Sequence, residues 1–142
     1  MSNLHKQWIA GFVDADGYFK VSLDPLNNSL NKRILLEFSI TRPASDIFIL
    51  QSLKKVFKCG KVMTKNDQCV YKIINIEHLR NHLIPYFEGD VLKSRKRQQF
   101  IHFRRIVRAY PERTLDEESF LKMKTLIDSY EKRKGVLSVL ST

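Results

Sequence analysis

Two aspartates separated by a single residue stand at the end of an apolar stretch near the N-terminus. The stretch reads Trp8-Ile9-Ala10-Gly11-Phe12-Val13-Asp14-Ala15-Asp16-Gly17. Carboxylates are ligands that Mg²⁺ accepts, usually one or two per ion with water and phosphate oxygens. If the stretch is a helix, its C-terminal end disfavours carboxylates unless a cation is bound. The pattern therefore indicates either a divalent metal site or a solvated helix end closed by Gly17 in the left-handed conformation.

The helix that would carry these carboxylates, predicted over about residues 3–14, has two faces of different character. One face is apolar and is expected to meet the chain's own core; it comprises Ile9, Phe12 and Val13. Gly11 and Ala15 lie on another face, where small side chains permit close approach of a second backbone. Glycine costs a helix interior about 1 kcal/mol relative to alanine, so its presence needs a reason. The small face predicts that another helix packs against this one.

The composition is that of a basic globular domain. With 142 residues, 43% of them hydrophobic, the chain fits one domain that buries roughly two-thirds of its unfolded surface. The 25 Lys and Arg residues exceed the 15 Asp and Glu residues, which gives a net charge of +10, and most of the excess lies in residues 91–142. This charge favours a polyanionic partner, although small basic proteins without one exist.

No segment indicates export or a membrane. The N-terminus leads almost at once into the Trp8 helix, without the regions of a signal peptide, and no run of eighteen apolar residues occurs. Cys59 and Cys69 lack the spacing of a zinc site and are interpreted as packing residues, reduced inside the cell. We expect an intracellular protein that does not span a membrane.

Two β-hairpins are predicted between helices. Residues 18–24 and 33–41 alternate between apolar and polar side chains on either side of a stretch rich in turn formers. Residues 61–65 and 69–74 form the second hairpin around the Asn66-Asp67 turn.

Helices are predicted around and after these hairpins. They cover 46–57, capped by Ser45, then 75–85 and 93–110, and a last helix follows a capping box at 114–117. The resulting order is αββαββα, an α+β fold with a four-stranded antiparallel sheet and helices packed on one face.

The other face of this sheet is predicted to carry mixed polar side chains. Such a mixture can read base edges in the major groove, whereas contact with phosphates alone asks for positive charge; a solvated sheet face is the alternative. By alternation, this face and the expected DNA contacts comprise Lys20, Ser22, Arg33, Glu37, Ser39, Lys61, Met63, Lys65, Gln68 and Lys72. A register shift by one residue would turn all of them inward.

A cluster of cations marks the start of the helix at 93–110. Positive charge is unfavourable near a helix N-terminus unless an anion is present, so the cluster favours a phosphate site over a solvated helix face. It comprises Lys93, Arg95, Lys96 and Arg97.

Residues 9–17, followed by Tyr18 and Phe19, resemble the LAGLIDADG motif that names the largest family of homing endonucleases. The nine positions differ from the motif only by conservative changes. The resemblance spans about residues 3–110 and leaves 111–142 as a helical extension of one domain. It implies the αββαββα fold and a site-specific endonuclease that cuts double-stranded DNA at long, nearly palindromic sites, across the minor groove.

A single copy of the motif implies a homodimer in this family. The residues expected at the interface are Trp8, Gly11, Asp14 and Ala15. The resemblance assigns a structural role to Asp14, which would bond backbone at the head of the partner helix. A contact between identical surfaces is what a two-fold dimer requires.

The resemblance assigns the metal to Asp16, the last acidic residue of the motif, with the backbone carbonyl of Ala15 as the adjacent ligand. Mg²⁺ is the expected cofactor, with Mn²⁺ able to substitute and Ca²⁺ binding without cutting. The ion would activate the attacking water and neutralise charge on the phosphate and the leaving 3′ oxygen.

Lys96 matches best the basic residue of the family's active site, with Lys93 and Arg95 as alternatives. Arg42 takes the place of a polar residue that helps to order the water shell. It is also expected to contact DNA, as are Lys93 and Arg95. The basic residue that should follow a few positions later is Asp46 in this sequence, so the solvent network departs from the family pattern.

Two functions of a different class remain open. Some relatives are intron maturases, which bind intron RNA, and others bind DNA without cutting. Both keep a basic face, but neither needs Asp16, whose presence favours the enzyme. An intron product of this kind is expected in an organelle, chloroplast or mitochondrion, or in a prokaryotic cytoplasm.

Overall fold

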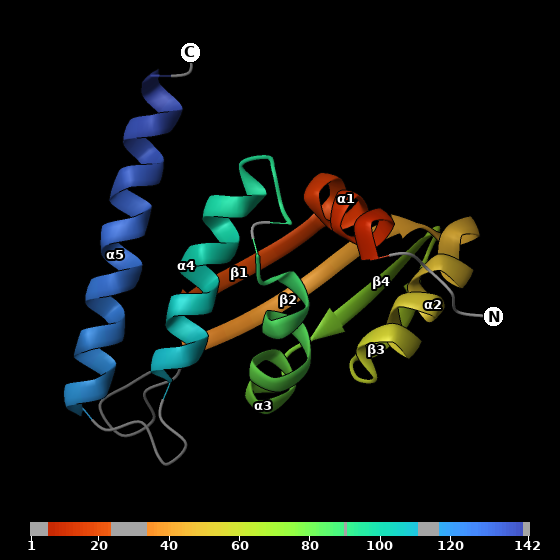
Figure 1. Cartoon of the computed structure of the whole chain (residues 1–142), viewed down its shortest axis with the longest axis horizontal. Coiled ribbons are helices and arrows are strands. Elements are labelled where there is room, and N and C mark those ends of the chain that lie inside the picture. The colour runs from red at the N-terminus through yellow and green to blue at the C-terminus, as the bar shows by residue number, and fades with distance from the viewer. Residues whose placement is uncertain (1–5, 24–33, 90, 111–116, 141–142) are drawn as a thin grey trace.

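The protein is described by a computed structural model for residues 6–23, 34–89, 91–110 and 117–140, with side chains described through Tyr130 apart from that of Leu23. Figure 1 gives the path of the chain. The elements are, in order, α1 Lys6–Asp16, β1 Gly17–Leu23, β2 Ile34–Pro43, a 3₁₀ turn Ala44–Asp46, α2 Ile47–Phe57, β3 Lys61–Lys65, β4 Gln68–Ile73, α3 Ile76–His78, a π turn Leu79–Leu83, a 3₁₀ turn Ile84–Phe87, α4 Lys96–Ala109 and α5 Glu117–Leu140. The predicted αββαββα order is confirmed, with α5 added after it.

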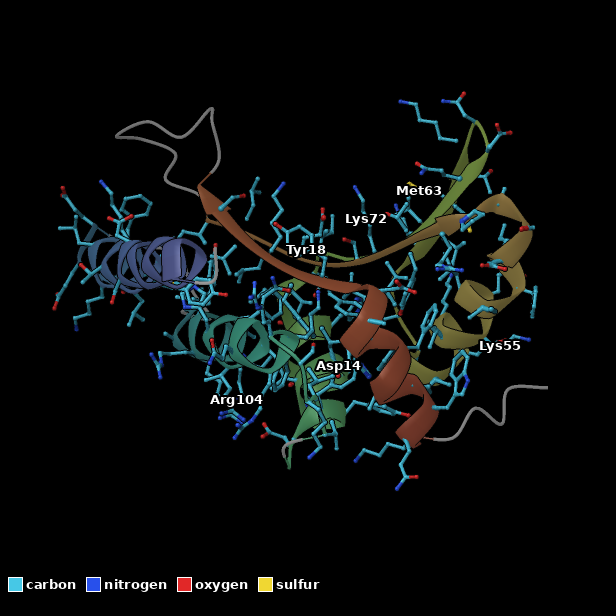
Figure 2. All side chains as sticks on the ribbon, turned by 90° about the horizontal axis from the view of Figure 1, so that it is seen from above. Asp14, Tyr18, Lys55, Met63, Lys72 and Arg104 are labelled. Atoms are coloured by element: carbon cyan, nitrogen blue, oxygen red, sulfur yellow. The ribbon has the colours of Figure 1, made fainter. Side chains whose placement is uncertain are left out.

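The four strands form one antiparallel sheet in the order β1-β2-β4-β3. Helices α1, α2 and α4 all lie on one side of the strands, and α5 lies beside α4 (Figures 1 and 2). Figure 2 shows none of the described helices on the other side of the strands, as predicted. Of the described helices, none combines the length and apolar character that a membrane crossing would need.

An aromatic cluster fastens α4 to the sheet. Phe19 of β1 has its ring centroid 5.1 Å from that of Phe38 on β2, 5.4 Å from Phe100 and 5.3 Å from Phe103, both on α4. The backbone N–H of Phe19 also donates to Oε1 of Gln99 at 2.9 Å. Burial of each ring stabilises the fold by about 1.5–3 kcal/mol. The start of α4 is therefore held close to the end of α1, where β1 begins.

Gly17 differs from its predicted role. It is the first residue of β1 and is absent from the positive-φ glycines of the described residues, so it does not close the helix in the left-handed conformation. A Cβ at Gly17 would lie 2.7 Å from Cγ1 and 2.8 Å from the carbonyl oxygen of Val13. Glycine is needed here because the strand passes close against α1, and α1 itself extends to Asp16, two residues beyond the prediction.

The start of α2 also differs from the prediction. Ser45 lies inside the 3₁₀ turn, and the residue in the N-cap position is Asp46, whose side chain makes no capping hydrogen bond. Other predicted features are confirmed: Asn75 Oδ1 accepts from the N–H groups of Glu77 and His78, and the two cysteines are free and buried. The capping residues 114–116 and the turn at 24–29 lie outside the described residues.

Candidate active site and nucleic-acid interface

Asp16 occupies the junction between α1 and β1, and its side chain is 35% exposed. Its Oδ2 accepts a hydrogen bond from Nη1 of Arg42 at 3.1 Å. Within the described part of the chain, no hydrogen bond is made to Oδ1. One carboxylate oxygen is thus restrained by a cation, while the other is open to an additional ligand.

Arg42 bridges two carboxylates. It follows the buried residues Phe38 and Ile40 at two-residue spacing on β2, so it points to the helix side of the sheet rather than to the outer face. Its Nε and Nη2 donate to Oδ2 of Asp46 at 3.0 and 2.8 Å, while Nη1 reaches Asp16. The pKa of Arg42 is raised, first by the hydrogen bond that it donates to Asp46 and also by the charge of Asp16, against the effect of burial.

Asp14 is bound to the start of α4. Its Oδ1 accepts from the backbone N–H of Ser94 at 2.9 Å, from the Ser94 hydroxyl at 2.7 Å and from the N–H of Lys93 at 3.2 Å. Burial raises the pKa of Asp14, but the hydrogen bonds from Ser94 and Lys93 and the charge of Lys96 outweigh it, so the pKa is lowered. Asp14 lies between α1 and α4 in Figure 2.

This position corrects the prediction for Asp14. The carboxylate does bond backbone at the head of a helix, as expected, but the helix is α4 of the same chain rather than that of a partner. The Phe19 cluster brings the two helix ends together within one chain, which the sequence alone does not reveal. The bonds to Ser94 fix the first turn of α4, since Ser94 Oγ also accepts from the N–H of Lys96 at 3.1 Å.

Lys96 is the first residue of α4 and faces the two aspartates of α1. Burial lowers its pKa, while the charges of Asp14 and Asp16 raise it, with a net lowering. Lys93 and Arg95 are exposed, whereas Lys96 is half-buried. Of the three basic residues considered from the sequence, Lys96 is therefore the one whose ammonium group is held within electrostatic reach of both carboxylates.

The donors for a metal ion are few within one chain. No group of three or more His, Cys, Asp or Glu side chains that could hold a metal occurs among the described residues. Asp16 and the Ala15 carbonyl, at the end of α1, remain as oxygen donors, because Asp14 is committed to Ser94. This set fits Mg²⁺, which keeps several waters and takes phosphate oxygens.

The outer face of the sheet carries the predicted polar side chains in the predicted register. Tyr18, Met63 and Lys72 project from the side of the strands opposite the helices (Figure 2). Eight of the ten residues predicted for this face are exposed or half-buried there, namely Lys20, Ser22, Glu37, Lys61, Met63, Lys65, Gln68 and Lys72. Ser39 shares the face but is only 8% exposed, so its hydroxyl is largely covered. Arg33 lies outside the described residues.

The charges on this outer face are poorly neutralised. Lys61 and Lys72 are directly opposite each other on β3 and β4, and like charges in that position destabilise a sheet. Lys72 Nζ lies 3.6 Å from Oε1 of Glu37, and this is the ion pair that the described residues form on the outer face. A polyanion placed over the strands would relieve this repulsion.

Two residues of the outer face are not among the predicted DNA contacts. Tyr18 is 44% exposed and Leu35 is 42% exposed, and both alternate with buried neighbours. The two-residue period places both outward, but large apolar side chains are usually assigned to the core, so neither is among the predicted DNA contacts.

A bare face of α1 matches the predicted dimer surface. Trp8 is 46% exposed and stacks on Phe12 with the ring centroids 5.2 Å apart. A Cβ added at Gly11 would meet nothing within 4 Å, and Ala15 is exposed. Within the described residues, no helix of this chain covers the small face of α1.

Comparison with known proteins assigns the fold and motif to a family. The family model described as "LAGLIDADG endonuclease" matches residues 9–107, which is more than half of the chain. The chain belongs to the LAGLIDADG endonuclease family. Asp16, Arg42 and Lys96 all lie inside the part that matches the LAGLIDADG model.

Solved LAGLIDADG structures share the architecture. The homing endonuclease I-TnaI is 32% identical, with a TM-score of 0.76 over 87% of this chain and 85% of that one. The LAGLIDADG homing endonuclease I-LtrWI, solved bound to target DNA, is 29% identical, with a TM-score of 0.77 over 89% of this chain and 44% of its own.

Proteins with similar sequences are also named as endonucleases. The DNA endonuclease I-CvuI of Chlorella vulgaris is 29% identical over 96 residues, which are 61% of this chain and 60% of that protein. A probable intron-encoded endonuclease of Neurospora crassa is 25% identical over 99 residues, 68% of this chain. The chain spans 21% of the length of the Neurospora protein.

Proposed function

We propose that this protein is a site-specific endonuclease that cuts double-stranded DNA as a homodimer, with a divalent metal ion at Asp16. The observation that carries the proposal is the arrangement around Asp16: a half-open carboxylate at the end of α1, with Arg42 bonded at 3.1 Å and Lys96 close by. The names of the relatives support it, since I-CvuI is a DNA endonuclease and I-LtrWI was solved on its target DNA.

The outer strand face supplies binding and recognition in this proposal. Lys61 and Lys72 neutralise phosphates, and Glu37 and Gln68 offer hydrogen-bonding groups to base edges. Tyr18 and Met63 add apolar contact surface. Salt should weaken the binding, because each neutralised phosphate releases counterions.

The residues at the end of α1 carry the chemistry. Asp16 and the Ala15 carbonyl would hold Mg²⁺, with Mn²⁺ as a substitute and Ca²⁺ as a non-cutting analogue. When bound, the ion lowers the pKa of the attacking water and offsets negative charge on the phosphate and the 3′ oxygen. Lys96 and Arg42 bring positive charge to the same phosphate, and Asp14 keeps Lys96 in place through Ser94.

The uncovered face of α1 supports the proposed homodimer. Among the described residues, Asp16 is the one carboxylate of each chain proposed to bind the metal, but two strands must be cut. Two copies meeting at Gly11 and Ala15 would bring two Asp16 side chains together around a two-fold axis. The relation to I-LtrWI supports this, since the chain covers 44% of that longer protein, which has room for two such units.

The variant Gly11→Leu tests the dimer. A Cβ at Gly11 meets nothing within its own chain, so the subunit should fold with unchanged or slightly higher stability. The added side chain should separate the dimer and abolish double-strand cutting. Sedimentation velocity and thermal unfolding measure both effects. A dimer that survives the substitution would place the interface elsewhere.

Cutting is tested with DNA that spans the insertion point of the intron, joined as in an intronless allele. With Mg²⁺ the wild-type protein should cut both strands, and Asp16→Asn should not. Asp128→Asn, which neutralises an exposed carboxylate on α5, serves as the matched control and should cut normally. A wild-type protein that leaves this DNA intact, or an Asp16→Asn variant that cuts it, would refute the proposal.

An intron maturase is the second candidate, because several relatives are named as intron-encoded proteins. The basic face suits intron RNA as well as DNA, and a purely binding protein has no need of Asp16. A splicing assay with the Asp16→Asn variant separates the two roles. Splicing that continues after DNA cutting is lost would mean that the protein has both. The organelle or prokaryotic location proposed for it follows from the same intron origin.

A further inference from the structure

Asp46 occupies the N-cap position of α2, but its side chain does not cap the helix. It is the N-cap residue of α2, and aspartate is among the best residues for that place, typically worth about 1 kcal/mol. Its carboxylate nevertheless makes no capping hydrogen bond. Both short contacts of Oδ2 go instead to Arg42, at 3.0 Å from Nε and 2.8 Å from Nη2.

The 3₁₀ turn Ala44–Asp46, which follows β2, brings Asp46 into contact with Arg42. Arg42 stands near the end of β2, and the 3₁₀ turn Ala44–Asp46 folds the chain back so that Asp46 reaches the guanidinium from the side. The turn is held to the next hairpin by a hydrogen bond of 2.8 Å from the N–H of Ala44 to the carbonyl of Asp67. The guanidinium is half-buried, and its edge that carries Nε and Nη2 is fully used by Asp46.

Arg42 therefore divides its nitrogens unequally between two carboxylates. Two nitrogens bind Asp46 and one binds Asp16. An arginine with no such partner can bind a carboxylate through two parallel N–H donors and occupy both of its oxygens. Applied to Asp16, such an arrangement would leave no oxygen for a divalent cation.

We propose that Asp46 is a positioning residue: it holds Arg42 by two nitrogens, limits Arg42 to one hydrogen bond on Asp16, and so keeps the other oxygen of Asp16 available for a divalent cation. The proposal rests on the metal site proposed at Asp16. It also explains the departure from the family pattern, in which a polar residue stands in place of Arg42 and a basic one in place of Asp46. In this chain the basic side chain of the pair is Arg42 instead of the residue at position 46, so one positive charge is still present at the site.

The charges around Asp16 support this role. Asp14 is tied to Ser94, and Lys96 acts on both aspartates through its charge, so Arg42 is the cation bonded to Asp16 among the described residues. The pair Arg42 and Asp46 is neutral as a unit, which leaves the site with the net negative charge that attracts a divalent cation. Loss of the Asp46 charge would leave Arg42 as an uncompensated competitor of the cation.

The first measurement is cation binding, with Mn²⁺ alone as the probe and electron paramagnetic resonance of free Mn²⁺ as the readout. Asp46→Asn should raise the Kd roughly threefold to fivefold, as expected for a change in a partly exposed ion pair. Asp46→Glu should stay within about twofold of wild type. In an Arg42→Gln background, Asp46→Asn should change the Kd by less than about twofold, because Asp46 acts through Arg42.

The second measurement follows Arg42 itself and needs neither metal nor DNA. The Nε–H resonance of Arg42 in ¹⁵N NMR spectra should exchange slowly with water in the wild type and in Asp46→Glu, and rapidly in Asp46→Asn. Thermal unfolding of each variant shows whether the fold is kept, which is expected because no helix cap is lost.

The outcomes separate this proposal from the proposed function. A wild-type protein that binds no Mn²⁺ refutes the metal site and with it the role of Asp46. Binding by the wild type that Asp46→Asn leaves unchanged refutes the role of Asp46 alone. An equal loss in the presence and absence of the Arg42 side chain would mean that Asp46 attracts the cation directly, which also contradicts the proposal.

Discussion

The cluster of charged residues at the end of α1, here called the acidic corner, comprises Asp14, Asp16, Arg42, Asp46 and Lys96. Its charges are paired within the chain, whereas, among the described residues, most of those on the outer strand face are not. In the corner, Asp14, Arg42 and Asp46 are engaged by hydrogen bonds of 2.7–3.2 Å. On the outer face, Lys61 and Lys72 oppose each other, and the Glu37 to Lys72 ion pair spans 3.6 Å. In the proposed function, the groups around the proposed metal site are thus fixed before a ligand arrives, whereas the groups proposed to bind a polyanion are left for the ligand to neutralise.

The largest effect is expected for Lys96 in the corner. Lys96→Met should lower the rate of DNA cutting about 10²-fold, the usual contribution of a positioned acid–base or electrostatic group, and should change DNA binding little. Lys124→Met, an exposed lysine on α5, is the matched control. The measurement compares single-turnover cutting with fluorescence anisotropy in Ca²⁺. A loss of binding as large as the loss of rate would place Lys96 with the recognition residues.

The outer face should show the reverse pattern. Replacing Lys61 and Lys72 by alanine should weaken DNA binding about tenfold or more at low salt and reduce the slope of log K against log salt by about 2. Saturating DNA should restore the cutting rate. Lys54→Ala with Lys55→Ala on α2, on the helix side, removes the same charge and is the control (Figure 2 labels Lys55). If the two double variants weaken DNA binding equally, binding depends on the net charge of the protein and not on the outer face.

Asp14 should affect stability with a defined pH dependence. Asp14→Asn keeps an acceptor but loses the charge, and should lower the free energy of unfolding by about 1 kcal/mol at pH 7. Because the pKa of Asp14 is lowered in the folded state, its contribution is present above the unfolded pKa of about 4 and is lost as pH falls through the folded pKa. Urea unfolding from pH 7 to pH 3 measures this. A constant difference between the variants across that range would contradict it.

The sequence predicted the strands well for a simple physical reason. Alternation with a period of two is a local property, so Lys20, Glu37 and Lys72 could be placed outward before their partners were known. Asp16 could be chosen over Asp14 only through the family motif, since both are carboxylates at the same helix end.

The sequence did not predict the contacts that form at the turn after β2 and where the end of α1 meets the start of α4. Asp46 looked like a mismatch to the family pattern, and only the 3₁₀ turn brings it onto Arg42. Asp14 meets Ser94 of its own chain because the aromatic cluster around Phe19 draws α4 toward α1. The Asp14 and Ser94 pair is 80 positions apart, where no local pattern gives a signal, whereas Arg42 and Asp46 are only four residues apart and meet because of the turn between them.

The central claim is that each copy contributes one Asp16 that acts on one DNA strand. A mixed dimer, purified with different tags on a wild-type subunit and an Asp16→Asn subunit, tests it most directly on a supercoiled plasmid that carries the target. We expect nicked circles that are not converted to linear DNA, with the nick on one strand of each duplex. Linear product at the wild-type rate, or no nicking at all, would contradict the account.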